Sequence, residues 1–318
     1  MTVAAAIAHP NIALVKYWGK RDPILNLSAT PSVSLTVSPF TTRTTVEWGA
    51  ERDEVVLNGV ARTDGTRRRV LQFLDLVDPH RPPCMVRSDN DFPTAAGLAS
   101  SSSAFAALAL AATKAAGQSP DPTALSLLAR RGSGSACRSI WGGLVHWPLG
   151  DRVDGLDSHG VPLRSDWNLA MVAAVVAEQE KETSSRDGMT RTQETSPLYE
   201  AWVANAPDDC DAALRAIEAR DLEALGTVME RSTFQMHATM ESADPPLRYL
   251  KPQSFEVVHR VEALRAAGTG AWVTMDAGPN VKVLCDPADV PGVVDAIADL
   301  GVATHVLGPG GPARWIDP

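Results

Sequence analysis

The segment DFPTAAGLASSSSA, residues 91–104, constrains this chain most, because it places a Pro and Gly turn and four serines directly before an Ala- and Leu-rich stretch. Helical spacing puts Phe105, Leu108 and Ala112 of that stretch on one face. A helix N-terminus attracts anions through its unpaired NH groups and partial positive charge. The hydroxyls could cap the helix, donate to phosphate oxygens or ligate Mg²⁺. The segment predicts a phosphate-binding helix N-terminus, although Ser-rich caps also begin many helices that bind nothing.

The composition is that of a globular protein. The chain has 318 residues, of which 44% are hydrophobic, and no apolar run approaches the roughly 18 residues needed to span a bilayer. The apolar start MTVAAAIAHPNIA lacks a basic region and breaks at His9 and Pro10, so it predicts a buried strand and not a signal peptide. No spacing typical of zinc or of a redox dithiol is found among the cysteines, which favours a reducing cytoplasm: Cys84, Cys137, Cys210 and Cys285.

The net charge of −9 argues against nucleic acid or an anionic membrane as a partner, since either would require a basic surface. An anionic ligand would therefore need a local cluster of cations. Candidates are Lys16, Lys20 and Arg21, then Arg138, then Lys181 and Arg186.

The order of predicted elements indicates an α+β fold. In the first half we expect strands at 11–15 and 32–37, a hairpin around the Asn and Gly turn of VVLNGV, and helices at 67–77, from 105 onward and at 122–131. The basic triplet at 67–69 is expected on the solvated side of its helix.

The second half begins with the apolar run at 168–177, which is typical of a central strand covered on both faces. We expect a domain boundary just before it. Helices, a hairpin, a helix and a strand follow, which suggests a βαββαβ-type split unit, with helices at 211–220, 222–229 and 255–267, strands at 272–275 and 281–284, a helix at 290–300 and a strand at 304–307.

Two further segments combine cations with groups that orient an anion. KYWGKRD packs Lys16, Tyr17 and Lys20 into a strand end. RRGSGSACRS joins a Gly and Ser turn to Arg138, whose guanidinium can bind an anion with two hydrogen bonds. The alternatives are an ordinary basic loop with Trp18 in the core, and a tight connection in which Arg138 pairs with a surface acid.

TMDAGPNV supplies one carboxylate, Asp276, on a turn between two apolar strands. An Asp in a Gly and Pro turn is usually only a turn former. Beside anion-binding segments, however, a carboxylate has a reason to be present if it accepts a proton or holds a metal. KETSSRDGM adds Ser185 and Arg186 just past the apolar strand, where a solvated loop is the competing interpretation.

These segments together resemble the GHMP small-molecule kinase superfamily and, within it, the mevalonate diphosphate decarboxylase family. PTAAGLASS alone would indicate only the superfamily, whereas KYWGK, SGSACRS and DAGPN are specific to the decarboxylase branch. The matching motifs occur in the family's order: NIALVKYWGKRD, DFPTAAGLASSSSA, RRGSGSACRSIWGG, KETSSRDGM and TMDAGPNV.

The resemblance implies a GHMP kinase-like two-lobed fold with the active site in the cleft between the lobes. The N-terminal ATP-binding lobe, residues 1–165, would be ribosomal protein S5 domain 2-like. The C-terminal lobe, residues 166–318, would be ferredoxin-like, of βαββαβ type. A cytoplasmic homodimer is also implied.

The implied activity is the ATP- and Mg²⁺-dependent conversion of mevalonate 5-diphosphate to isopentenyl diphosphate, CO₂, ADP and phosphate, a step of isoprenoid and lipid biosynthesis in the mevalonate pathway. Phosphorylation turns the tertiary 3-hydroxyl into a leaving group. Its departure draws electrons from the bond to the carboxylate carbon, so no pyridoxal or thiamine electron sink is needed.

The resemblance assigns roles to individual residues. Asp276 would orient or deprotonate the 3-hydroxyl, Arg138 would face the substrate carboxylate, and Lys20 would hold the diphosphate. Further substrate contacts would come from Tyr17, Ser133, Gly134, Ser135, Ser185 and Arg186. ATP would contact Pro93, Ala95, Ala96, Gly97, Leu98, Ala99, Ser100 and Ser101. Mg²⁺ would be bound by Ser100 and Ser101.

Two points stay open at this stage. The role of Lys16 is not assigned, and the chain has Thr30 and Pro31 where family members tend to carry an Asn. The alternatives to the implied activity are a decarboxylase acting on the monophosphate, a 3-hydroxyl kinase that does not decarboxylate, and a catalytically silent nucleotide-binding regulator. Retention of Asp276, Arg138 and Lys20 favours the full reaction on the diphosphate.

Overall fold

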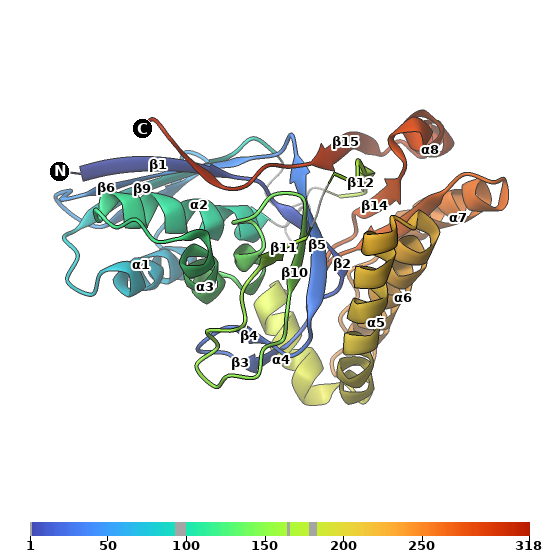
Figure 1. The fold of residues 1–318 in the computed structure, drawn as a ribbon, viewed down its shortest axis with the longest axis horizontal. Coiled ribbons are helices and arrows are strands. Elements are labelled where there is room, and N and C mark those ends of the chain that lie inside the picture. The colour runs from blue at the N-terminus through green and yellow to red at the C-terminus, as the bar shows by residue number, and fades with distance from the viewer. Residues whose placement is uncertain (1, 93–99, 164–165, 178–182) are drawn as a thin grey trace.

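Two large β-sheets form the frame of the protein (Figure 1). The computed structural model describes residues 2–92, 100–163, 166–177 and 183–318. The six-stranded sheet belongs mostly to the first half of the chain, and the eight-stranded sheet is shared by both halves.

The six-stranded sheet has its helices on one face (Figure 1). Its order is β16-β1-β6-β9-β7-β8, with β16 Arg314–Ile316, β1 Thr2–Ala8, β6 Thr42–Trp48, β9 Cys84–Asn90, β7 Glu54–Leu57 and β8 Val60–Ala61. The hairpin predicted from VVLNGV joins β7 and β8, and its turn residues Asn58 and Gly59 both have positive φ. This sheet therefore offers one apolar face to the helices.

The helices predicted for the first half are confirmed as α1 Gly65–Val77, α2 Ser100–Ala115 and α3 Pro122–Gly132. α2 is buried along nearly its whole length against β1 and β6. Its many alanines allow this close approach, and larger side chains such as Phe73 and Phe105 fill the remaining space. The packing fixes the position of the N-terminus of α2.

The eight-stranded sheet joins the two halves of the chain. The first half gives β2 Asn11–Val15, β5 Ser32–Ser38, β10 Leu144–Trp147 and β11 Val161–Pro162. The join is made where β5 pairs with β15 Ala303–Pro309. A separate ribbon follows β2 and consists of β3 Lys20–Asp22 and β4 Leu27–Ser28.

The second half confirms the predicted βαββαβ unit. β12 Ala170–Val175, β13 Ala271–Met275, β14 Val281–Cys285 and β15 lie in the order β15-β12-β14-β13, and every neighbouring pair is antiparallel. β12 is buried at every position, as its apolar run predicts. The helices of this half are α4 Ser185–Thr195, α5 Tyr199–Ala219, α6 Leu222–Glu241, α7 Pro252–Ala266 and α8 Val290–Ile297.

Three short 3₁₀ helices complete the described elements: η1 Gly134–Cys137, η2 Pro287–Asp289 and η3 Ala298–Leu300. The last strand, β16, pairs with β1 and so returns to the first sheet. The lobe boundary between residues 165 and 166 stays a prediction. In the described part of the chain, no helix has the length and apolar character that crossing a bilayer requires.

Candidate active site

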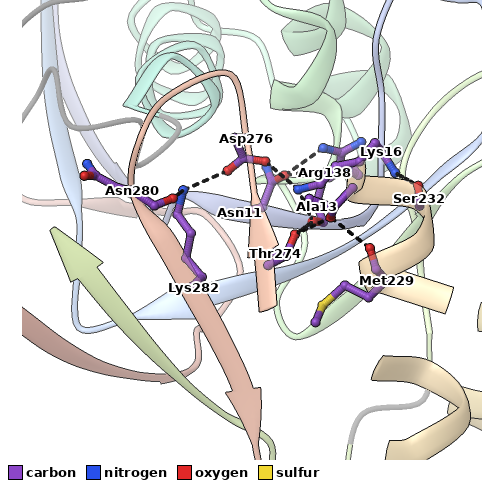
Figure 2. Close-up of polar contacts among 11 residues, drawn as sticks. Asn11, Ala13, Lys16, Arg138, Met229, Ser232, Thr274, Asp276, Asn280 and Lys282 are labelled. Atoms are coloured by element: carbon purple, nitrogen blue, oxygen red, sulfur yellow. Dashed lines mark hydrogen bonds and ion pairs between the residues drawn. The ribbon is translucent and has the colours of Figure 1, made fainter. Parts of the chain in front are cut away.

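Two predicted site residues, Asp276 and Arg138, come together with Lys16 where β2, the β13–β14 hairpin and η1 meet (Figure 2). Lys16 directly follows β2, Asp276 directly follows β13, and Arg138 follows η1. Each therefore stands at the end of a buried element, where the backbone turns and a polar side chain can reach a cleft. The structure brings together a carboxylate, an ammonium and a guanidinium from distant parts of the sequence.

Asp276 is held between two lysines (Figure 2). Lys16 Nζ lies 2.9 Å from Oδ1 and Lys282 Nζ lies 3.3 Å from Oδ2. Both lysine side chains are 1% exposed, whereas that of Asp276 is 24% exposed. Burial raises the pKa of the Asp276 carboxyl, but Lys16 and Lys282 outweigh it and hold that pKa well below its usual range. Asp276 is therefore an ionised carboxylate that remains partly exposed.

Lys16, whose role the sequence left open, is an ion-pair partner. Its Nζ also donates to the Ala13 carbonyl at 3.0 Å, and its backbone NH donates to Ser232 Oγ on α6 at 3.0 Å. Burial lowers the pKa of Lys16 to about 8, against the opposing effect of Asp276. Thr30, in the loop that departs from the family pattern, is buried and donates to the Lys16 carbonyl at 3.3 Å.

Arg138 is fully buried and bound by side chains of the eight-stranded sheet. Its Nε and Nη2 donate to Asn11 Oδ1 at 3.1 and 3.0 Å, and its Nη1 donates to Ser32 Oγ. Asn11 in turn donates to the Ser135 carbonyl at 3.0 Å and to Ser139 Oγ at 2.7 Å. No acid among the described residues pairs with Arg138, so the predicted alternative of an ion pair with a surface acid is wrong; its role at the substrate stays a prediction. Asn11 is the first residue of the motif NIALVKYWGKRD, but no role was predicted for it from the sequence.

The glycine and serine turn before Arg138 packs against Tyr17. A Cβ added at Gly134 would lie 2.6 Å from Tyr17 Oη, so only glycine fits. The Tyr17 ring meets Trp147 edge to face, with centroids 4.9 Å apart. Tyr17 Oη is buried and makes no hydrogen bond among the described residues. A ligand between the turn and β2 would meet this hydroxyl.

A second group of cations lies beside Tyr17. Burial lowers the pKa of Lys20 to about 8, and the like charges of Arg186 and Arg69 lower it further. Arg69 was expected on the solvated side of its helix, and this prediction is wrong. It donates to the Gly132 carbonyl at 3.2 and 2.7 Å and lies over the Phe105 ring, because α1 packs against α3. The group has the charge expected of a diphosphate site.

Ser185 and Arg186 form the first turn of α4, where a solvated loop had been the competing interpretation. Ser184 caps this helix by accepting from the Asp187 NH at 3.2 Å. Arg186 is exposed. Lys181, from the same predicted cluster, lies outside the described residues.

The four serines of the predicted phosphate site divide into two pairs. Ser102 and Ser103 are buried. Ser102 Oγ accepts from the Asn11 NH at 3.4 Å, and Ser103 Oγ lies 2.6 Å from Thr42 Oγ1. Ser101 is exposed at the start of α2, with its Oγ 3.3 Å from Ser133 Oγ. Ser102 and Ser103 thus have partners inside the fold, and the predicted ligand role of Ser100 and Ser101 stays a prediction. The other predicted ATP contacts lie outside the described residues: Pro93, Ala95, Ala96, Gly97, Leu98 and Ala99.

The donor set fits a magnesium ion that is ligated mainly by phosphate oxygens. Across residues 2–92, 100–163, 166–177 and 183–318, no three His, Cys, Asp or Glu side chains cluster as a metal site. Mg²⁺ commonly keeps few protein ligands and binds through substrate phosphates. Serine hydroxyls at a helix N-terminus suit that arrangement.

Comparison with known proteins decides the family. A model described as a diphosphomevalonate decarboxylase-like N-terminal domain matches residues 8–160, and one described as a mevalonate 5-diphosphate decarboxylase C-terminal domain matches residues 171–306. The diphosphomevalonate decarboxylase of Candida albicans is 37% identical over 310 residues, which cover 91% of this chain and 86% of the relative. The chain belongs to the diphosphomevalonate decarboxylase family. The Bos taurus member is also 37% identical, over 89% of this chain and 76% of its own length.

Solved structures of the diphosphomevalonate decarboxylase family share the whole fold. Mevalonate diphosphate decarboxylase from Staphylococcus aureus has a TM-score of 0.93 at 36% identity and covers 99% of this chain and 98% of its own. The structure of MDDEF in complex with MVAPP, AMPPCP and magnesium has a TM-score of 0.93 at 38% identity, and the match covers 100% of this chain and 99% of its own. The predicted α+β fold of this family is confirmed.

Proposed function

We propose that this chain is an ATP-dependent diphosphomevalonate decarboxylase, which converts mevalonate 5-diphosphate to isopentenyl diphosphate, CO₂, ADP and phosphate. Membership of the family supports the reaction class. The observation that carries the proposal is the meeting of Asp276, Lys16 and Arg138, because it places an ionised, partly exposed carboxylate beside two cations, of which Arg138 would face the carboxylate of the substrate.

The reaction begins at the 3-hydroxyl. Asp276 accepts a hydrogen bond from that hydroxyl and orients its oxygen toward the γ-phosphorus. Since its pKa lies far below the ordinary value, Asp276 is a weak base, and the proton passes from the hydroxyl to Asp276 late, as the new P–O bond forms. ADP leaves with the electrons of the broken P–O bond.

Decarboxylation follows without any further electron sink. Departure of the 3-phosphate takes the electron pair of the C3–O bond. The electrons of the bond between the carboxylate carbon and C2 then form the C2–C3 double bond, which releases CO₂. Arg138, fixed by Asn11 and Ser32, holds the carboxylate so that its bond aligns with the departing phosphate.

The diphosphate would lie on Lys20, Arg186 and Tyr17, next to the turn formed by Ser133, Gly134 and Ser135. Ser100 and Ser101 would hold the triphosphate and Mg²⁺ at the N-terminus of α2, and the metal spreads the charge of the phosphoryl group in transfer. A cytoplasmic homodimer accompanies this proposal as an expectation.

The test is an assay of purified protein with ATP and Mg²⁺ on three substrates: mevalonate, its 5-phosphate and its 5-diphosphate. Equal amounts of CO₂ and ADP with the diphosphate alone are expected. CO₂ from the monophosphate would assign the sister decarboxylase, and ADP without CO₂ would assign a kinase. Absence of both products with all three substrates would support a silent nucleotide-binding protein.

A further inference from the structure

Lys282 is a buried cation to which the reaction described above gives no role. It lies inside β14, opposite Ala173 of β12 and Thr274 of β13, and its side chain is 1% exposed. A buried ammonium is costly unless it is paired. Lys282 Nζ donates hydrogen bonds to Asp276 Oδ2 at 3.3 Å and to the Asn280 carbonyl at 3.4 Å. The lysine is therefore bound to the hairpin that carries the catalytic carboxylate.

Strand geometry explains how Lys282 reaches Asp276. Alternate residues of a strand share a face, and directly opposed residues share it too, so Lys282 lies on the α6 side of the sheet with Thr274. Thr274 Oγ1 contacts Thr233 Oγ1 of α6 at 3.1 Å and donates to the Ala13 carbonyl at 3.3 Å. Asp276 follows on the same side. Lys16, directly after β2, and Lys282, within β14, thus approach its carboxylate from two sides (Figure 2).

The turn between Asp276 and Lys282 is anchored independently. Asn280 Oδ1 accepts from the NH groups of Val176 and Ala177 at 2.7 and 3.0 Å, and its Nδ2 donates to the Ala177 carbonyl at 3.1 Å. This side chain ties the turn to the end of β12. Lys282 therefore does not need to hold the hairpin together, and its contact with Oδ2 fixes the rotation of the Asp276 carboxylate.

We propose that Lys282 is a positioning residue for the decarboxylation, which holds Oδ2 of Asp276 so that the carboxylate presents a fixed oxygen to the 3-hydroxyl. Lys282 is too buried to contact substrate and acts through Asp276. Without it, both carboxylate oxygens are free to turn toward Lys16, the remaining ammonium. Among the described residues, the charges of Arg138 and His237 also couple to Asp276; burial lowers the pKa of His237 to about 3, so it is neutral near pH 7.

This proposal rests on the proposed function and predicts a specific kinetic signature. In Lys282→Met, kcat should fall about 10- to 100-fold, the equivalent of one charge-assisted hydrogen bond, while KM for both substrates stays within about threefold. Its Tm should not fall, because Asp276 and Lys16 remain as a balanced pair and an apolar side chain replaces a buried charge. Lys282→Arg, which keeps the charge, should recover part of the lost kcat.

The experiment measures kcat, both KM values and Tm for wild type, Lys282→Met and Lys282→Arg, with Lys114→Met on the surface as a matched control. The control should behave as wild type. Wild-type kcat in Lys282→Met would overturn the proposal, as would a loss shared by kcat, both KM values and Tm, which is the pattern of a structural residue. CO₂ release by wild type in the same assay tests the proposed function separately.

Discussion

Replacement of Arg138 by lysine keeps the positive charge but removes the planar guanidinium group and its fixed set of donors. The guanidinium makes three hydrogen bonds, of which two go to Asn11 Oδ1 at 3.1 and 3.0 Å and one goes to Ser32 Oγ. A lysine has one head group and can keep one of these contacts in this buried position. Loss of two charged hydrogen bonds at about 1.5 kcal/mol each removes about 3 kcal/mol that fixes the cation in place. The substrate carboxylate would then meet one donor in place of a two-pronged guanidinium, and loss of one charged hydrogen bond to it corresponds to a fall in kcat/KM of roughly 10- to 100-fold.

The matched control is Arg130→Lys. Arg130 is also buried, at 2% exposure, and donates to the carbonyls of Leu25 and Gly155 at 3.1 and 2.7 Å, away from Asp276. Both variants should lose stability in a thermal melt. Only Arg138→Lys should lose activity per folded enzyme in the coupled ADP and CO₂ assay. Equal losses of activity in the two variants, or full activity in Arg138→Lys, would refute the role of Arg138 at the carboxylate.

Three further predictions follow from the same contacts. Asp276→Ala should abolish ATP-dependent phosphate release while the nucleotide Kd, measured by calorimetry, changes little; near-normal turnover would remove Asp276 from the mechanism. The kcat/KM for the diphosphate substrate should fall as pH rises through about 8, because Lys20 of the free enzyme loses its proton there and with it its attraction for the diphosphate, and Lys16 loses the charge that pairs with Asp276. A profile flat to pH 10 would contradict those depressed pKa values. Gly134→Ala should raise KM for the diphosphate, since its Cβ would meet Tyr17 Oη at 2.6 Å, whereas Gly292→Ala, with open space around it, should not; equal KM values in both variants would show that the Tyr17 contact is not needed.

Much of the fold could be predicted from the sequence because its signals are local. The β2 segment after Asn11 and the whole of β12 are apolar runs of strand length. The end of α7 is marked by Gly268. The long helices α5 and α6 were predicted too short. α5 begins at Tyr199, ahead of Pro207, a residue type that usually breaks helices, and α6 continues to Glu241. β9 and β16 were not predicted; β16 is only three residues long and forms through pairing with β1 at the other end of the chain.

The site residues could be predicted from the sequence only where they lie within a recognisable local motif. Asp276 and Arg138 stand in distinctive motifs. Asn11 has no such signal, because its partner Arg138 lies 127 residues away and only the fold joins them. Lys282 occurs within an apolar strand, and its burial depends on the packing of α6 against the neighbouring strand β13. Tertiary contacts thus supplied the partners that hold the predicted residues.

The central claim is that the 3-hydroxyl is phosphorylated before CO₂ is lost, and an isotope measurement tests it directly. Mevalonate 5-diphosphate carrying ¹⁸O in the 3-hydroxyl would be converted with unlabelled ATP, and the released phosphate would be analysed by mass spectrometry. The account predicts one ¹⁸O atom in each phosphate, because the hydroxyl oxygen becomes the bridging oxygen and leaves with the phosphoryl group. Unlabelled phosphate formed together with CO₂ would contradict it.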